Sequence, residues 1–566
     1  MMKIGVYLGY APLRDVSLLS EGLGRYLGML VKILVERKHE ITVACPPWLI
    51  QKLVELFDEY DIGKDEISFI TLPTPALLRT YDLVSDLKNK RKRAKRRHFH
   101  YVTMSFFSLI FNTLIFIKHF SFLLLFSVAL ALGGIIITPP LLLFLLFFTI
   151  IRKVSDLAGY LFGKSFSVLT RLLKKFELTK PLKSFLKGNK PLSALWNEII
   201  QAMRNSVCKD LVRKINKQKK GPDVWYAPAA YWKEYTDIKG VTVTCFPDLS
   251  TAVFAEGFSI WDFSSITDDV RYVTHWSKYI ITYCDYQKLA MVVNMLGRDP
   301  ACIRAVGLFV NDMSSYLDAS DGFSQYWRNS AGLYFAKRLL STLWVHSNHK
   351  IWPYWAGPLC NYTFMDMKYV FYSSQCRPNK NILTLVKAYE YLLKKKEVTF
   401  KLVLTGNLDN ATEVREYVYE KRLQFDIVTF SQVSNQQLAA LYACAELVVN
   451  STLYEGGFLM IFSEGMSVGT PSVMSRIPQV TEVTDDYDID DCLFNPVDHV
   501  DMANKILYGV QNREKLVKRQ QPLYDTLSRW CKEDAGRDYE EAFNYFINLE
   551  QQMLTAKKRN FHNVEK

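Results

Sequence analysis

Residues 451–471 read STLYEGGFLMIFSEGMSVGTP, which is the most informative stretch of this 566-residue chain. The pattern predicts the end of a strand, a glycine-rich loop that carries Glu455, a short helix that opens with Glu464, and a Gly-Thr-Pro turn into another strand. Glycine lets a backbone approach a ligand closely, and a helix N-terminus attracts phosphate. Such a cradle between two carboxylates suits a nucleotide-sugar, with phosphates against the helix start and hydroxyls against the carboxylates.

The segments on both sides of this stretch alternate between strands and helices. Helices are expected at 26–37 and 382–394. Apolar strands are expected at 3–8, 40–45, 223–228, 241–246, 279–283, 368–372 and 400–405. This rhythm predicts parallel sheets with helices on both faces. We therefore expect an α/β protein with two units, each built on a parallel sheet.

The same patterns predict how the chain divides into domains. We expect an N-terminal domain at 1–87 and 221–320, a basic and hydrophobic insertion at 88–220, an interdomain segment at 321–366, a C-terminal domain at 367–530, and a last helix and tail at 531–566. The last helix, at about 532–555, has apolar residues at helical spacing, so it can pack across both domains.

The insertion has the sequence pattern of a membrane segment. It opens with a basic run at 88–97, and residues 101–151 then contain no Asp or Glu and only one cation, Lys118. Residues 120–138 are 19 consecutive apolar or small residues, about the length that crosses a hydrocarbon core. Both flanks belong to one domain, so residues 101–151 are expected to form a hydrophobic hairpin. Its turn falls either at 118–119 or at 133–140.

The positive charge of the chain is concentrated in the insertion. The formal net charge is +13, and residues 88–220 alone hold 26 Lys or Arg against 4 Asp or Glu. Cations on both flanks of a hairpin indicate the cytoplasmic side, and basic amphipathic helices bind anionic lipid. We expect the protein at the cytoplasmic face of the inner (plasma) membrane. A buried hydrophobic hairpin of a soluble domain is the alternative. Nucleic acid is not expected as a partner, because no basic-aromatic binding module is present.

The cysteines and histidines show no metal-binding pattern. The ten cysteines include no CxxC pair, and several lie in apolar, strand-like runs, which indicates reduced core residues. Of the nine histidines, His346 and His349 could share a helix face, but the pattern favours a solvated loop pair, so no metal site is expected.

With these motifs in view, the chain resembles the retaining glycosyltransferases of the GT-B fold, family 4, over about 1–85, 222–310 and 368–545. The resemblance implies the GT-B architecture, in which two Rossmann-like, doubly wound domains face a cleft. That family carries two glutamates with seven residues between them, whereas eight separate Glu455 from Glu464. The resemblance implies that Glu464 accepts hydrogen bonds from ribose hydroxyls at a helix start. It also implies that Glu455 is catalytic, near the donor sugar, and that Gly456 and Gly457 contribute to donor binding.

Family members also hold the donor diphosphate with an arginine and a lysine that follow a strand. Residues 373–381, SSQCRPNKN, follow the expected strand at 368–372 in the same way. Lys380 falls on the family's lysine, whereas Gln375 holds the arginine position and Arg377 comes two residues later. A departing nucleoside diphosphate gains negative charge and needs such cations. The resemblance therefore implies that Arg377 and Lys380 bind the donor.

Three further segments resemble the acceptor side of the family. Gly22 and Gly24 resemble its glycine loop, and residues 281–288 match its strand-to-helix step. Residues 244–249, TCFPDL, resemble its His-Asp segment with Pro in place of His, which leaves Asp248 as the polar candidate for catalysis.

These features together predict a membrane-associated retaining hexosyltransferase. The expected donor is a GDP- or UDP-linked sugar of mannose or glucose type, the expected acceptor is lipid-linked or a glycan, and the expected context is surface polysaccharide biosynthesis. The family usually needs neither cofactor nor metal. The alternatives are a catalytically inactive membrane scaffold on the same fold, and a sugar synthase or phosphorylase with a soluble acceptor.

Overall fold

The computed structural model describes most of the chain outside the insertion. The described residues are 1–10, 18, 22–75, 78–79, 192–246, 260–317, 336–341, 367–430 and 433–564. The predicted hairpin at 101–151 and Asp248 lie outside these residues. The chain splits into two compact units, one of Met1–Tyr10, Val16–Thr71 and Leu211–Lys566, and the other of Ala11–Asp15 and Leu72–Asp210. All contacts described below lie within the first unit.

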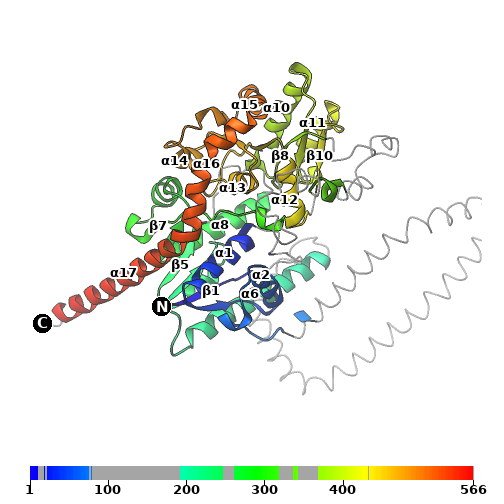
Figure 1. Ribbon diagram of the computed structural model, residues 1–566. Coiled ribbons are helices and arrows are strands. Elements are labelled where there is room, and N and C mark those ends of the chain that lie inside the picture. The colour runs from blue at the N-terminus through cyan, green and yellow to red at the C-terminus, as the bar shows by residue number, and fades with distance from the viewer. Residues whose placement is uncertain are drawn as a thin grey trace, which may run out of the picture. The chain divides into compact units, whose positions relative to one another are not determined.

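The first sheet has seven strands among the described residues and is entirely parallel (Figure 1). Its strands are β1 (Lys3–Tyr7), β2 (Glu40–Ala44), β3 (Ile67–Ile70), β4 (Val224–Ala227), β5 (Thr242–Cys245), β6 (Tyr279–Thr282) and β7 (Ile303–Ala305). They lie in the order β3-β2-β1-β4-β5-β6-β7, with Val6 opposite both Val43 and Tyr226. The order reverses between β1 and β4, which is the winding of a Rossmann domain. The predicted strands of this sheet are confirmed.

Helices cover this sheet and bury apolar faces against it. They are α1 (Gly22–Glu36), α2 (Ile50–Glu59), α8 (Ile260–Trp276) and a π-helical segment at Gln287–Met295. A further helix, α6 (Leu192–Asn216), begins in the second unit and ends in the first. In α1 the buried apolar residues include Tyr26, Leu27, Leu30 and Leu34, a spacing that places them on one helix face. The predicted start of this helix, at residue 26, is wrong, because the first turn also contains Gly22 and Gly24.

The second sheet repeats the winding of the first with six described strands. These are β8 (Tyr369–Tyr372), β9 (Lys401–Leu404), β10 (Ile427–Thr429), β11 (Leu447–Asn450), β12 (Ser472–Ser475) and β13 (Leu493–Phe494). All are parallel, in the order β10-β9-β8-β11-β12-β13, so this sheet reverses between β8 and β11. The chain is therefore an α/β protein with two Rossmann-like parallel sheets.

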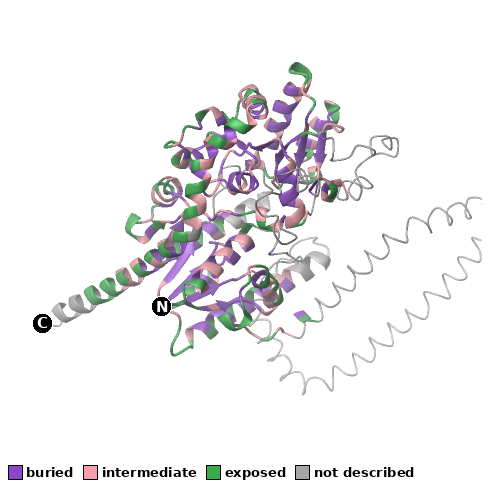
Figure 2. Cartoon of the chain, viewed as in Figure 1, coloured by how far each residue is buried: buried purple, intermediate pink, exposed green. Residues whose placement is uncertain are grey.

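Both faces of the second sheet are covered, which explains why its strands are apolar runs rather than alternating ones. The covering helices are α10 (Ile382–Lys395), α11 (Thr412–Glu420), α12 (Asn435–Cys444), α13 (Met460–Ser467), α14 (Pro478–Thr484) and α15 (His499–Gln511). One core contains Leu385 and Val449, and the other contains Leu441 and Val448. Figure 2 shows the strands as the buried centre of this arrangement.

The C-terminal helical run contacts both sheets. It comprises α16 (Arg513–Arg529), a π-helical turn at Trp530–Asp534 and α17 (Ala535–Val564). The Gln520 amide on α16 bonds both the N–H (2.9 Å) and the C=O (2.6 Å) of Ser472 in β12. On α17 the ring of Phe546 stacks on Tyr279 of β6, with centroids 4.8 Å apart. The contact with the second sheet comes from α16 and the contact with the first sheet from α17, so the prediction that the helix at about 532–555 itself packs across both domains stays a prediction. No described helix is long and apolar enough to span a bilayer.

Candidate functional site

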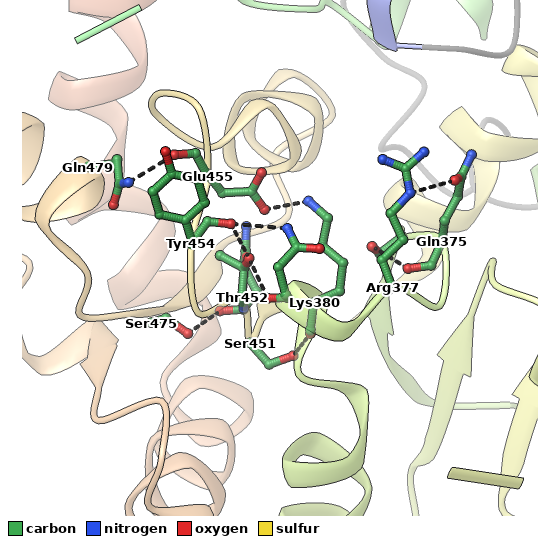
Figure 3. Close-up of polar contacts among 12 residues, drawn as sticks. Gln375, Arg377, Lys380, Ser451, Thr452, Tyr454, Glu455, Ser475 and Gln479 are labelled. Carbon is green, nitrogen blue, oxygen red and sulfur yellow. Dashed lines mark hydrogen bonds and ion pairs between the residues drawn. The ribbon is translucent and has the colours of Figure 1, made fainter. Parts of the chain in front are cut away.

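Two loops meet where the strand order of the second sheet reverses. One loop follows β8 and ends at Lys380, and the other follows β11 and contains Glu455; the two strands are neighbours. The Lys380 ammonium donates to Glu455 Oε1 (Figure 3). Their side chains are 22% and 23% exposed, so the pair is accessible to a ligand. Ligands of doubly wound sheets bind beyond the carboxyl ends of the strands at such a reversal.

A set of hydrogen bonds fixes the two loops to each other. The C=O of Asn379 accepts from the N–H of Leu453 (2.8 Å) and the hydroxyl of Thr452 (3.0 Å), and the buried Asn379 amide donates to the C=O of Tyr454 (3.2 Å). The Ser451 hydroxyl donates to the C=O of Lys380 (2.9 Å). These bonds hold the Lys380 and Glu455 backbones in place before any ligand arrives, which lowers the entropy cost of binding.

Arg377 lies on the β8 loop but outside the Lys380–Glu455 pair. Its side chain is exposed, and its Nε donates to the Gln375 amide oxygen at 3.0 Å (Figure 3). The residue in the family's arginine position therefore orients Arg377, whose terminal guanidinium nitrogens make no hydrogen bond within the described part of the chain.

Glu464 is buried in α13, with an exposed fraction of 2%. Among the described residues, its Oε1 accepts from Arg25 Nη1 (2.7 Å) and Asn311 Nδ2 (2.9 Å), and its Oε2 accepts from the Tyr442 hydroxyl (2.5 Å). The prediction that Glu464 opens the helix is wrong, because α13 begins at Met460. The carboxylate therefore lies in the second turn and is bound by side chains rather than by first-turn N–H groups.

The boundaries of α13 follow from its sequence. Leu459 is extended (φ −75°, ψ 106°) and packs in the core, so the helix begins one residue later, and the predicted glycine loop ends before Met460. The helix ends at Ser467, two residues before Gly469, whose φ of +65° is left-handed, and Thr470 N–H bonds back to Gly465 C=O at 2.8 Å. This is the usual glycine stop of a helix, and the predicted Gly-Thr-Pro turn is confirmed.

The buried charge of Glu464 is compensated by its partners, because an isolated buried carboxylate would be very costly. The carboxylate of Glu464 raises the pKa of Arg25 above its usual value, which keeps the guanidinium charged. Burial, followed by the same carboxylate, raises the pKa of Tyr442 well above its usual range, so its hydroxyl stays a donor.

The Gly456–Gly457 loop lies against the segment that follows β6. A Cβ on Gly457 would lie 2.8 Å from Cβ of Tyr283, so only glycine fits there without a shift. The Cys284 thiol donates to the C=O of Gly456 at 3.9 Å. The Glu482 carboxylate on α14 accepts from the N–H groups of Asp285 (2.8 Å) and Tyr286 (2.9 Å). The predicted acceptor-side step at 281–288 therefore contacts the predicted donor loop.

The two N-terminal glycines differ in their surroundings. Gly22 is exposed, and a Cβ added to it would meet nothing within 4 Å, whereas a Cβ on Gly24 would lie 1.9 Å from the C=O oxygen of Leu18. Arg25 follows directly in the same turn of α1 and contacts Glu464. Asp248 lies outside the described residues, so its catalytic role stays a prediction.

Sequence reasoning missed three side chains of the site, namely Arg25, Asn311 and Tyr442. Arg25 had a signal, because it adjoins Gly24 in the glycine segment. Asn311 is 153 residues from Glu464 in the sequence and Tyr442 is 22, and neither lies in a motif. In the described part of the chain, no group of three His, Cys, Asp or Glu side chains could hold a metal ion.

One protein family and two curated relatives match parts of this chain. Residues 367–512 match the family described as Glycosyl transferases group 1. The O-antigen chain mannosyltransferase B of Escherichia coli is 31% identical over 119 residues, which cover 21% of this chain and 31% of that protein. An uncharacterized glycosyltransferase of Methanocaldococcus jannaschii is 27% identical over 118 residues, which cover 21% of this chain and 30% of that protein. The chain thus matches less than a third of each relative's length.

Among solved structures, the chain is similar to Anabaena HepE in complex with UDP and glucose, with 11% identity and a TM-score of 0.48 over 96% of this chain and 98% of that one. A glycosyltransferase from Rickettsia africae has 12% identity and a TM-score of 0.44 over 98% and 97%. The matched residues, 367–512, include the loops that carry Lys380 and Glu455 and the helix that carries Glu464, so the candidate site lies in the part of the chain that is similar to the group 1 glycosyl transferases.

Proposed function

We propose that this protein is a membrane-associated, retaining glycosyltransferase of surface polysaccharide biosynthesis. It moves a hexose of mannose or glucose type from a GDP- or UDP-linked donor to a lipid-linked or glycan acceptor. The observation that carries the proposal is the Lys380–Glu455 pair where the second sheet reverses, with Glu464 on the next helix. The match of residues 367–512 to the group 1 glycosyl transferases covers all three residues.

Each residue has a role in this proposal. Lys380, with Arg377 on the exposed side of the same loop, neutralises the charge that grows on the leaving diphosphate, which lowers the barrier to departure. Glu464 accepts hydrogen bonds from the ribose hydroxyls. Glu455 lies near the donor sugar, and its bond to Lys380 keeps both side chains at the loop junction until the diphosphate competes for the lysine.

Sequence supports the choice of substrates and location. The relative from Escherichia coli is named for O-antigen chain mannosyl transfer, which favours a mannose-type donor and a polysaccharide product. The basic run at 88–97 and the apolar stretch at 101–151 favour a lipid-linked acceptor at the cytoplasmic face of the inner membrane. Because Lys380 and Arg377 supply positive charge, we propose that no metal or cofactor is needed.

The test is a donor screen on the full-length protein in detergent or native membranes. GDP-mannose, UDP-glucose and other UDP-hexoses are offered in EDTA with an extract of lipid-linked acceptors, and product is followed by mass spectrometry. We expect transfer from one donor, with the anomeric configuration retained in the NMR spectrum of the product. Absence of both transfer and donor hydrolysis with every donor would contradict the proposal.

The same preparation distinguishes the alternatives. An inactive scaffold would show no thermal shift with UDP or GDP, and Glu464→Gln would leave its cellular role intact. A synthase or phosphorylase with a soluble acceptor would keep full activity after deletion of residues 101–151, whereas a transferase with a lipid-linked acceptor should lose most of its activity.

A further inference from the structure

Arg25 connects the first turn of α1 to the carboxylate on α13. Its Nη1 lies 2.7 Å from Glu464 Oε1, and the two side chains are 21% and 2% exposed. The ion pair therefore joins a helix of the first sheet to a helix of the second. A charge-assisted hydrogen bond of this length is stronger than one between neutral groups.

The Glu464 carboxylate has little accepting capacity left in this state. A carboxylate oxygen accepts two hydrogen bonds well, and Oε1 already accepts two, from Arg25 and Asn311. Oε2 accepts one, from Tyr442, in the described part of the chain. A vicinal diol that donates one hydrogen bond to each oxygen would therefore find a free position on Oε2 and none on Oε1.

Of the two donors on Oε1, Arg25 is the one that can leave. Asn311 is 6% exposed, whereas Arg25 is more exposed and belongs to the helix of the other sheet. In addition, Arg25 Nε is buried and has no hydrogen-bond partner among the described residues. An unsatisfied buried N–H is costly, so this position of the guanidinium is not its best-bonded one.

We propose that Arg25 competes with the nucleotide for Glu464. In the unliganded protein Arg25 occupies the position on Glu464 Oε1 that a ribose hydroxyl takes, and the nucleotide binds by displacing it. This inference rests on the proposed function. The displaced guanidinium moves toward solvent, while Asn311 and Tyr442 keep Glu464 in place. Arg25 thus weakens the binding of ligands with a ribose diol by the cost of breaking the ion pair, and it leaves ligands without the diol unaffected.

The test is isothermal titration of UDP and GDP into the full-length protein in detergent, comparing wild type with Arg25→Met. The variant keeps the length of the side chain and frees Oε1, so we expect the nucleotide that binds to do so about tenfold more tightly, equivalent to about 1.4 kcal/mol. The 2′,3′-dideoxy form of that nucleotide should bind both proteins equally, because it lacks the hydroxyls that compete with Arg25. A purely structural role would not depend on the ribose hydroxyls.

Arg37→Met is the matched control, because Arg37 follows α1 and pairs with Glu540 on α17 at 2.6 Å, away from Glu464. It should leave nucleotide affinity unchanged. Arg25→Lys, which keeps a cation near Glu464, should give a nucleotide affinity between those of wild type and Arg25→Met. If circular dichroism shows that Arg25→Met does not fold, Arg25→Lys is the variant compared with wild type.

Three results would overturn the inference. If both Arg25 variants bind the nucleotide as tightly as wild type or more weakly, Arg25 does not compete with the nucleotide. If Arg25→Met tightens binding of the dideoxy nucleotide by the same factor, the competition does not depend on the ribose diol. Either result leaves the proposed function standing. If neither UDP nor GDP binds any variant or the wild type, the proposed function fails and this inference fails with it.

Discussion

At the scale of single residues, the candidate site contains two ion pairs that differ in burial and in the elements they join. Lys380–Glu455 is half-buried, joins two loops of one sheet and can be reached by a ligand. Arg25–Glu464 is largely buried and joins helices of both sheets. The first pair can exchange its partner for a diphosphate at little desolvation cost, whereas the second must give up a buried charge-assisted bond. The two glutamates of one sequence motif are therefore expected to act at separate steps of donor binding.

Replacement of Lys380 by methionine tests the first pair. Lys380→Met removes the cation that faces the leaving diphosphate but keeps the length of the side chain, so kcat/KM for the donor should fall roughly 100-fold. Steady-state kinetics with the donor found in the screen measure this. Lys387→Met is the control, because Lys387 on α10 lies over the ring of Tyr417 (5.7 Å) and should change kcat/KM by less than about twofold. Equal effects of the two substitutions would remove Lys380 from donor binding.

Replacement of Glu464 by glutamine tests the second pair. Glu464→Gln keeps the shape but leaves the Arg25 guanidinium without a counter-charge, so the free energy of unfolding should fall by about 2 kcal/mol. The ribose also loses its charged acceptor, so nucleotide affinity should fall at least about tenfold. Urea unfolding and titration calorimetry give the two numbers. Glu416→Gln, at an exposed position of α11, should change neither. A stable variant with unchanged affinity would show that Glu464 has no part in binding.

At the scale of elements, the first turn of α1 contains two glycines with opposite requirements. Gly22 has open space around it, so Gly22→Ala should raise helix propensity and stabilise the protein by about 0.5–1 kcal/mol. Gly24→Ala would place a carbon 1.9 Å from the Leu18 carbonyl, so it should destabilise by about 3 kcal/mol or more and move Arg25. Thermal unfolding of the two variants measures the difference. Equal stabilities would mean that Leu18 does not pack on α1.

The elements also show what the sequence could predict and what it could not. Strands such as 368–372 were predictable because buried parallel strands are unbroken apolar runs, and β8 occupies four of those five residues. The start of α1 could not be predicted, because glycine at positions 22 and 24 is typical of a loop. Only the structure shows that Leu18 approaches Gly24 closely. Glu464 was assigned to a helix start because the pattern does not show that apolar Met460–Phe462 already form the first turn.

The candidate site also has a part that the sequence could predict and a part that it could not. Lys380 and Glu455 lie in local motifs beside neighbouring strands, so their proximity follows from the topology of a parallel sheet alone. The partners of Glu464 could not be predicted, because Arg25 and Asn311 reach it only through the folding of distant segments. Single-sequence patterns carry no information on contacts of that range.

At the scale of the whole described unit, the C-terminal helical run joins the two sheets. Gln520 binds the backbone of β12, and 19 residues later the Tyr539 hydroxyl bonds that of Tyr26 on α1 at 2.6 Å. The Tyr26 hydroxyl also bonds Tyr226 of β4. Burial raises the pKa of Tyr26 and Tyr226 well above the usual tyrosine range, so these hydroxyls remain neutral donors and acceptors. Arg25 directly precedes Tyr26, so α17 supports the helical turn that carries Arg25.

An acidic residue next to Tyr539 gives this support a pH dependence. Glu540 accepts from Arg37 Nε (2.7 Å) and Nη2 (2.6 Å) and contacts the ring of buried His39, whose Nδ1 accepts from Met2 N–H. The hydrogen bond from Arg37, assisted by His39, lowers the pKa of Glu540 below its usual value of 4.5. A carboxylate with a lowered folded pKa stabilises the fold in full above its unfolded pKa, and this contribution is lost as pH falls through the folded value.

Glu540→Gln should therefore destabilise the protein in a pH-dependent way. At pH 7 the free energy of unfolding should be lower than that of wild type by about 1 kcal/mol, a modest value because solvent screens this partly exposed pair. The difference should narrow as pH falls below 4.5 and vanish once wild-type Glu540 is protonated as well. Urea unfolding at pH 7, 5 and 3.5 measures it. Glu541→Gln is the control, because Glu541 is 71% exposed on the same helix and should show little difference at any pH. If the difference in unfolding free energy between wild type and Glu540→Gln stays constant, or widens in acid, Glu540 acts through packing rather than through its charge.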